Sequence, residues 1–142
     1  IVCYSKFGQR GPDQTDEGIE IKPGVSVLSA PLKFNMDGCV KFAYPHGHDE
    51  LLMVALENKS SRETLLRTVP EVGADGTFRD FRPHQVYRDD KGFTVTKRDD
   101  YEMVMVHHHP LQNPNIHHGM GNYLLYMTPG VCPRSANTAS AR

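Results

Sequence analysis

Short segments rich in β-branched and aromatic residues recur along the chain, with turn-forming residues between them. The clearest are residues 39–44 (CVKFAY), 51–58 (LLMVALEN) and 121–127 (GNYLLYM). Others are residues 24–35, where Pro31 is expected to break the strand, and residues 62–72, 77–81 and 92–109. Turn residues return every ~8–12 positions, which is typical of sandwiches and barrels. The pattern predicts an all-β, antiparallel two-sheet sandwich.

The segment Glu50–Glu57 is the one place where a helix competes with a strand. It has no suitable capping residues at a helical spacing, and Pro45 and the turn at Asn58 crowd it. We therefore expect a strand there too.

A chain of 142 residues suits one domain with one core. We expect an irregular N-terminal arm over residues 1–20, the folded domain over residues 21–133 and a polar tail over residues 134–142. The formal net charge of −1 gives no reason to expect a nucleic-acid or acidic-membrane partner. No apolar run reaches the ~18 residues of a membrane span. The start at Ile1 instead of Met suggests a processed mature chain, which we favour, or an artificial start.

Three cysteines, at positions 3, 39 and 132, leave at least one thiol without an intramolecular partner. None lies in a CxxC motif, so a thiolate zinc knuckle is not expected. One disulfide in a small secreted or periplasmic domain is the favoured interpretation. The glycosylation sequon Asn58-Lys59-Ser60 adds weak support for secretion.

Histidines are the residues most suggestive of chemistry, because seven of the eight gather in two segments. The eight histidines are His46, His48, His84, His107, His108, His109, His117 and His118, and only His84 lies outside the two segments. On a strand, residues two apart share a face, so the His-x-His pair at 46 and 48 can offer two imidazoles to one ion. His107 and His109 have the same property, with His108 on the opposite face. Imidazole suits copper, zinc, iron and nickel, and a thioether such as that of Met120 shifts the preference to copper.

Plainer interpretations stand beside the metal site. A single His-x-His pair is more often surface decoration, a run of three histidines can be an exposed strand end, and Met120 can fill a core. Other chemistries have less support, because the chain has no glycine-rich phosphate loop and no G-x-S-x-G elbow. The paired acids at 89–90 and 99–100 are typical of solvated turns.

Three stretches, KFAYPHGH, FTVTKRDDYEMVMV and HHGMGNYLLYM, resemble the C-terminal domain of copper type II, ascorbate-dependent monooxygenases. These enzymes include peptidylglycine α-hydroxylating monooxygenase and dopamine β-monooxygenase. The resemblance spans about residues 20–133 and implies an antiparallel jelly-roll sandwich. It implies that His46, His48 and Met120 bind copper and that Asn122 contacts substrate. It also implies a disulfide between Cys39 and Cys132.

The chain departs from this family in several places. The family's second domain, with its own copper, has no counterpart here. The arginine shortly before His-x-His is absent, the cysteine after the ligand methionine is Gly121, and a substrate-contacting tyrosine position is Leu124.

Three hypotheses follow from these features. The first is a secreted or periplasmic copper-binding protein whose open copper position takes O₂ or a small molecule. The second is a copper-dependent monooxygenase or oxidase that acts with a second metal site or a partner domain. The third is a zinc-binding or structural β-sandwich. A partner chain or a homo-oligomer is compatible with each of these hypotheses. His107, His109, His117 and His118 are secondary metal candidates, whereas His84 is expected at the surface.

Overall fold

The computed structural model of the chain describes residues 2–3, 19–47, 50–75, 78–81, 85–112 and 117–133. No α-helix occurs in this part of the chain, and its regular elements are strands. They are β1 (Val2–Cys3), β2 (Ile19–Ile21), β3 (Gly24–Leu32), β4 (Gly38–Gly47), β5 (Leu51–Asn58), β6 (Glu63–Thr68), β7 (Glu71–Val72), β8 (Phe78–Asp80), β9 (Tyr87–Val95), β10 (Tyr101–His109), β11 (His117–Gly119) and β12 (Gly121–Pro129). The prediction of an all-β protein is confirmed.

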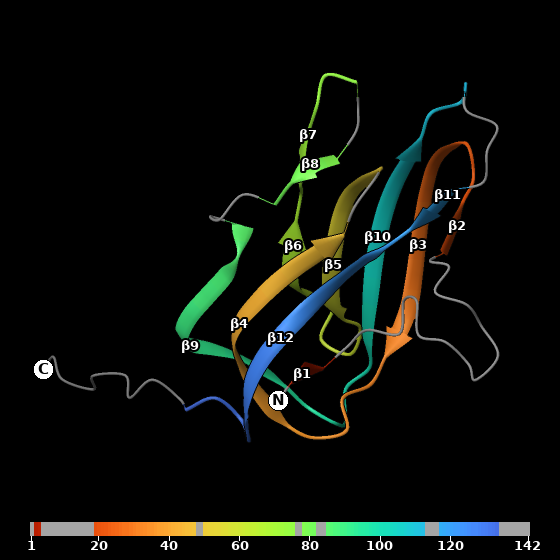
Figure 1. Cartoon of the computed structure of the whole chain (residues 1–142). Coiled ribbons are helices and arrows are strands. Elements are labelled where there is room, and N and C mark those ends of the chain that lie inside the picture. The colour runs from red at the N-terminus through yellow and green to blue at the C-terminus, as the bar shows by residue number, and fades with distance from the viewer. Residues whose placement is uncertain are drawn as a thin grey trace, which may run out of the picture.

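Two four-stranded antiparallel sheets form a sandwich-like fold (Figure 1). One sheet has the order β1-β12-β4-β9 and the other has the order β3-β10-β5-β6. Two small pairs, β2 with β11 and β7 with β8, extend beyond them. The apolar core contains residues from both main sheets, among them Val40 and Leu125 from the first sheet and Val54 and Met103 from the second.

Alternating burial along the strands explains how the sequence fills this core. In β10, Tyr101, Met103 and Met105 are buried while the residues between them are half-exposed. In β12, Tyr123 and Leu125 are buried in the same alternating way. A strand places successive side chains on opposite faces, so one face of each sheet faces the core and the other faces outward.

Pro31 and Pro45 lie within strands before their last residues, and the break expected at Pro31 does not occur. Pro31 does not break its strand, because β3 continues to Leu32. β3 lies at the edge of its sheet as far as the described residues show, and edge strands are where proline is tolerated within a sheet. β4 similarly continues through Pro45, because β9 pairs with it only as far as Ala43.

A disulfide joins Cys39, near the start of β4, to Cys132, just after β12. The pairing implied by the family resemblance is therefore confirmed. Because 93 residues separate the two cysteines, the bond ties the first long strand of one sheet to the end of the last strand.

Asn58, the asparagine of the sequon, is the last residue of β5 and has a structural role there. Asn58 is only 6% exposed, and its amide Nδ2 donates to Asp99 Oδ2 at 3.1 Å. Its Oδ1 accepts from the backbone N–H groups of Ser60 and Ser61 at 2.9 and 3.0 Å. The side chain therefore holds the β5–β6 turn against the turn that precedes β10.

The proposed arm and tail lie largely outside the described residues. Within residues 1–20, β1 pairs with β12 and β2 begins at Ile19, whereas residues 134–142 are outside the described part. The described residues contain no helix that could cross a membrane.

Candidate metal centre

One end of the sandwich brings together four places that are distant in the sequence (Figure 1). They are the end of β4, the start of β5, the end of β10 and the junction of β11 with β12. Pairing establishes this, because Gly47 of β4 lies opposite Gly121 of β12, and Leu51 of β5 lies opposite His107 of β10. The two pairs also touch, since a side chain added at Gly121 would meet Leu51.

His46 and Asn122 lie side by side on the outward face of this end. They are Cα partners in the β4–β12 ladder, and partners in an antiparallel pair project to the same face. Ala43 and Pro45 of β4 face the core, so His46 faces outward and is exposed. The two residues that the family resemblance connects with copper and substrate are thus brought together across 76 residues of sequence.

Met120 lies directly before β12 and is half-buried. A Cβ atom added to Gly47 would come within 2.8 Å of the Met120 backbone oxygen and would also collide with the Leu51 side chain. The residue between the two histidines of His-x-His therefore lies against Met120. This close approach explains why position 47 is glycine.

Asn122 has an unusual side-chain oxygen. Its Oδ1 atom is buried and accepts no hydrogen bond from the described residues. Buried carbonyl oxygens are nearly always paired with protein or water. This unsatisfied acceptor belongs to the Cα partner of His46, which makes it a candidate hydrogen-bonding position for a ligand with an N–H or O–H group.

His107 and His109 lie at the same end of the sandwich but face the core. Both are fully buried, and His108 between them is half-exposed on the other face. The predicted sharing of a face by His107 and His109 is confirmed. The ring of His107 packs against Gly119, where an added Cβ would lie 2.6 Å from Nε2.

Glu50 connects to these histidines through two hydrogen bonds. Its Oε1 lies 2.8 Å from His109 Nδ1, and its backbone oxygen accepts from the His108 N–H at 2.8 Å. Glu50 has φ of 70°, a left-handed conformation that is uncommon outside glycine. Glu50 lies directly before β5, and its carboxylate is buried beside His109.

The remaining candidates are only partly described. His48 and His84 lie outside the described residues, and His117 and His118 belong to β11 without described side chains. Among the side chains that are described, no group of three or more His, Cys, Asp or Glu residues is arranged to hold a metal ion. Thioether sulfur and His48 are not among these side chains.

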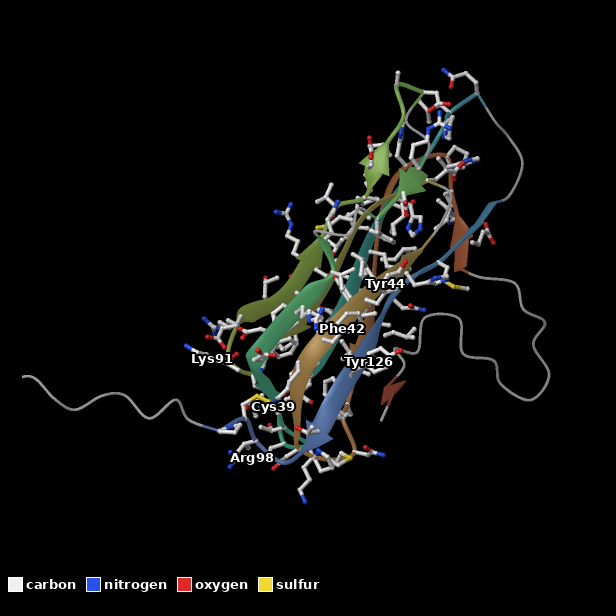
Figure 2. All side chains as sticks on the ribbon, turned by 60° about the vertical axis from the view of Figure 1, so that its left-hand side comes forward. Cys39, Phe42, Tyr44, Lys91, Arg98 and Tyr126 are labelled. Atoms are coloured by element: carbon white, nitrogen blue, oxygen red, sulfur yellow. A yellow bond between two sulfur atoms is a disulfide. The ribbon has the colours of Figure 1, made fainter. Side chains whose placement is uncertain are left out.

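Sequence reasoning missed Glu50, because its partner His109 is 59 residues away and no local motif links them. It also missed a row of aromatic side chains beside His46. Phe42, Tyr44 and Tyr126 lie on the outward face of β4 and β12, and both tyrosines are exposed (Figure 2). The alternation of Phe42, Tyr44 and His46 in β4 was the available signal.

Comparisons of the chain with protein-family models, curated proteins and solved structures found no match. The resemblance to the copper monooxygenases therefore rests on the sequence motifs described above.

Proposed function

We propose that this chain is a secreted or periplasmic copper-binding protein whose ion is held by His46, His48 and Met120. The observation that carries the proposal is the contact between Gly47 and the Met120 carbonyl. Two segments 72 or more residues apart, one with the imidazoles and one with the thioether, meet at this contact. Neither segment alone would favour a metal over ordinary surface or core residues.

The covalent structure of the chain supports His48 as a ligand beside His46 and Met120. His48 lies outside the described residues, but it is bonded to Gly47 as Met120 is bonded to Gly121. Because Gly47 and Gly121 are paired, both ligands start one residue from the same rung of the ladder.

A jelly roll is the form of sandwich that we propose. Support comes from the order in which the eight strands of the two main sheets pair. Taken along the chain, the first pairs with the last (β1 with β12), the second with the seventh (β3 with β10), the third with the sixth (β4 with β9) and the fourth with the fifth (β5 with β6). Such nested pairing is what two interleaved Greek keys produce.

Two imidazoles and one thioether suit a copper site that cycles between oxidation states. The soft sulfur favours Cu(I), whereas imidazole also suits Cu(II). Three protein ligands leave room for a small molecule or O₂, and the buried Asn122 oxygen lies where it can accept a hydrogen bond from that molecule. Bound copper would supply oxygen chemistry, while these residues orient what binds beside it.

Copper binding without independent catalysis is the form that we propose first. The arginine that the family has shortly before His-x-His is missing, because Tyr44 and Pro45 are the residues directly before His46. The Cys39–Cys132 disulfide supports a secreted or periplasmic location, because such bonds persist in oxidising compartments.

The test is a Cu(I) competition titration against a chromophoric chelator, with elemental analysis of the purified protein. Met120→Leu and His46→Ala should each weaken Cu(I) binding by at least about tenfold, which corresponds to about 1.4 kcal/mol. Met120→Leu should weaken Zn(II) binding much less, because zinc has less preference for thioether sulfur.

Matched controls separate loss of a ligand from general damage. Met36→Leu changes a half-buried methionine two residues before β4 begins, and His108→Ala removes a histidine on the outward face of the other sheet. Both should bind copper like the wild-type chain. Unchanged Cu(I) affinity in Met120→Leu would show that the thioether assignment is wrong.

A further inference from the structure

The outward face of the sheet β1-β12-β4-β9 carries an aromatic row that leads away from His46. Tyr44 and Phe42 follow His46 at two-residue intervals along β4, so all three share a face. Tyr126 lies opposite Phe42 on β12, and the two ring centroids are 5.3 Å apart with an edge-to-face angle of 77°. Figure 2 shows Tyr44, Phe42 and Tyr126 along these two strands.

An open pocket of about 470 Å³ lies at this row. Its lining residues are Phe42, Tyr44, Asp80, Phe81, Val86 and Arg88. Tyr44 is 43% exposed, so a large ring surface remains in water. Concave sites with aromatic walls and a few polar groups are typical of small-molecule binding. The wall of this pocket therefore suits a flat apolar group such as an aromatic ring.

The charged residues of the pocket indicate which charge a substituent on the bound ring should have. Arg88 is the Cα partner of Phe42, so its guanidinium starts on the same face as the aromatic row. Within the described residues, Arg88 makes no ion pair. Asp80 is the other charged residue of the lining, and its Oδ1 already accepts the Phe81 N–H at 2.7 Å. The guanidinium of Arg88 is thus the cation that the pocket offers to an anionic group, while the Asp80 carboxylate is oriented toward the Phe81 backbone through Oδ1 and keeps its charge.

We propose that this pocket binds a small aryl carboxylate, with the ring against Phe42 and Tyr44 and the carboxylate on Arg88. A guanidinium pairs with a carboxylate through two parallel hydrogen bonds. Aromatic rings prefer offset or edge-to-face contacts such as these side chains offer.

The site is adjacent to the proposed copper site and does not require it. Residues two apart on a strand are separated by about 7 Å, which is the spacing between Tyr44 and His46. A ligand in the pocket could therefore extend a substituent toward His46 and Asn122. The idea that the pocket serves as a substrate site rests on the proposed copper-binding function. Binding of the aryl carboxylate does not, because it is expected of the metal-free protein.

The experiment measures binding of three probes to the metal-free chain by NMR titration of backbone amides. Phenylacetate, 2-phenylethanol and 2-phenylethylamine carry the same ring with an anionic, a neutral and a cationic group. We expect phenylacetate to bind with a dissociation constant of about 1 mM, as befits so small a ligand. The neutral probe should bind about tenfold more weakly and the cationic probe more weakly still, with shifts confined to β4, β9 and their neighbours.

Three variants test the assignment of the groups. Arg88→Met keeps the aliphatic stem and should lower phenylacetate affinity about tenfold, to that of 2-phenylethanol. Tyr44→Ala should weaken both probes. Lys91→Met removes another exposed cation of β9, which lies away from Tyr44 in Figure 2, and should change nothing.

Equal affinity for the three probes, or unchanged phenylacetate affinity in Arg88→Met, would overturn the proposal. Shifts that map to other strands, or no binding at about ten times the expected dissociation constant, would also overturn it. Because copper is absent throughout, none of these results depends on the copper site.

Discussion

Replacement of Gly47 by alanine tests the contact on which the proposed copper site depends. The added methyl group would lie 2.8 Å from the Met120 backbone oxygen, and it would also meet a Leu51 methyl group. The leucine can rotate, but the Met120 carbonyl belongs to the backbone and must move by about half an ångström to reach ordinary contact. Met120 should therefore shift relative to His46, and the ligands should no longer meet the ion in their original geometry.

The expected magnitudes follow from these contacts. Overpacking costs about 1–3 kcal/mol, and alanine recovers about 0.5–1 kcal/mol because glycine loses more backbone entropy on folding. A net loss of about 1–2 kcal/mol should lower the melting temperature by about 3–8 °C in a chain of this size. Cu(I) affinity should fall by at least about tenfold in a chelator competition at 25 °C.

Gly38→Ala is the matched control, because it adds the same methyl group at the other end of β4. There it would collide with the Met127 side chain, far from the histidines. We expect lower stability with unchanged copper affinity. If Gly47→Ala is folded and binds Cu(I) as tightly as the wild-type chain, the contact between Gly47 and Met120 does not shape a metal site and the reasoning is refuted.

Three further predictions concern the scaffold. Tyr123→Phe should lower the free energy of unfolding by about 1–3 kcal/mol in urea titrations, because the buried hydroxyl bonds to both β5 and β6 of the opposite sheet at 3.0 and 2.8 Å. Burial raises the pKa of Tyr123, so wild-type stability should fall above pH ~10, where the unfolded state ionises first, and this fall should be smaller in the variant. Glu102→Gln should destabilise at pH 7, because the Lys59 hydrogen bond lowers the pKa of Glu102; the difference should vanish as pH falls through that lowered pKa, and a constant difference would contradict it. Asn58→Ala should cost about 2–3 kcal/mol through three lost hydrogen bonds, with copper affinity unchanged; a neutral effect on stability would contradict the turn-forming role.

The sequence predicts the strands well where turn-forming residues flank a single strand on both sides. Residues 51–58 match β5, and residues 121–127 lie within β12. It does not show that residues 92–109 belong to different sheets, β9 in one and β10 in the other. The sheet that a strand joins depends on partners elsewhere in the chain, and these partners leave no local pattern.

For the candidate site, the sequence predicts well which side chains lie on the same face of a strand. It predicts less well whether that face is turned toward the core or toward the solvent. Within β10, the charged residue Glu102 marks the outward set, so His107 and His109 belong to the inward set with Met103 and Met105. The local pattern is sufficient there. The structure agrees, since both histidines are buried in the core.

In β4 the same reasoning gives the wrong face for His46. Lys41 is exposed, and strict alternation from it would turn Tyr44 and His46 inward. A bulge between Val40 and Phe42 adds one residue and reverses the alternation, because a shift of one residue moves every later side chain to the opposite face. The bulge therefore places His46 and the aromatic row outward, where ions and solutes can reach them, while the other His-x-His pair is buried in the core. A difference of one residue in strand register separates a possible ligand pair from a structural one.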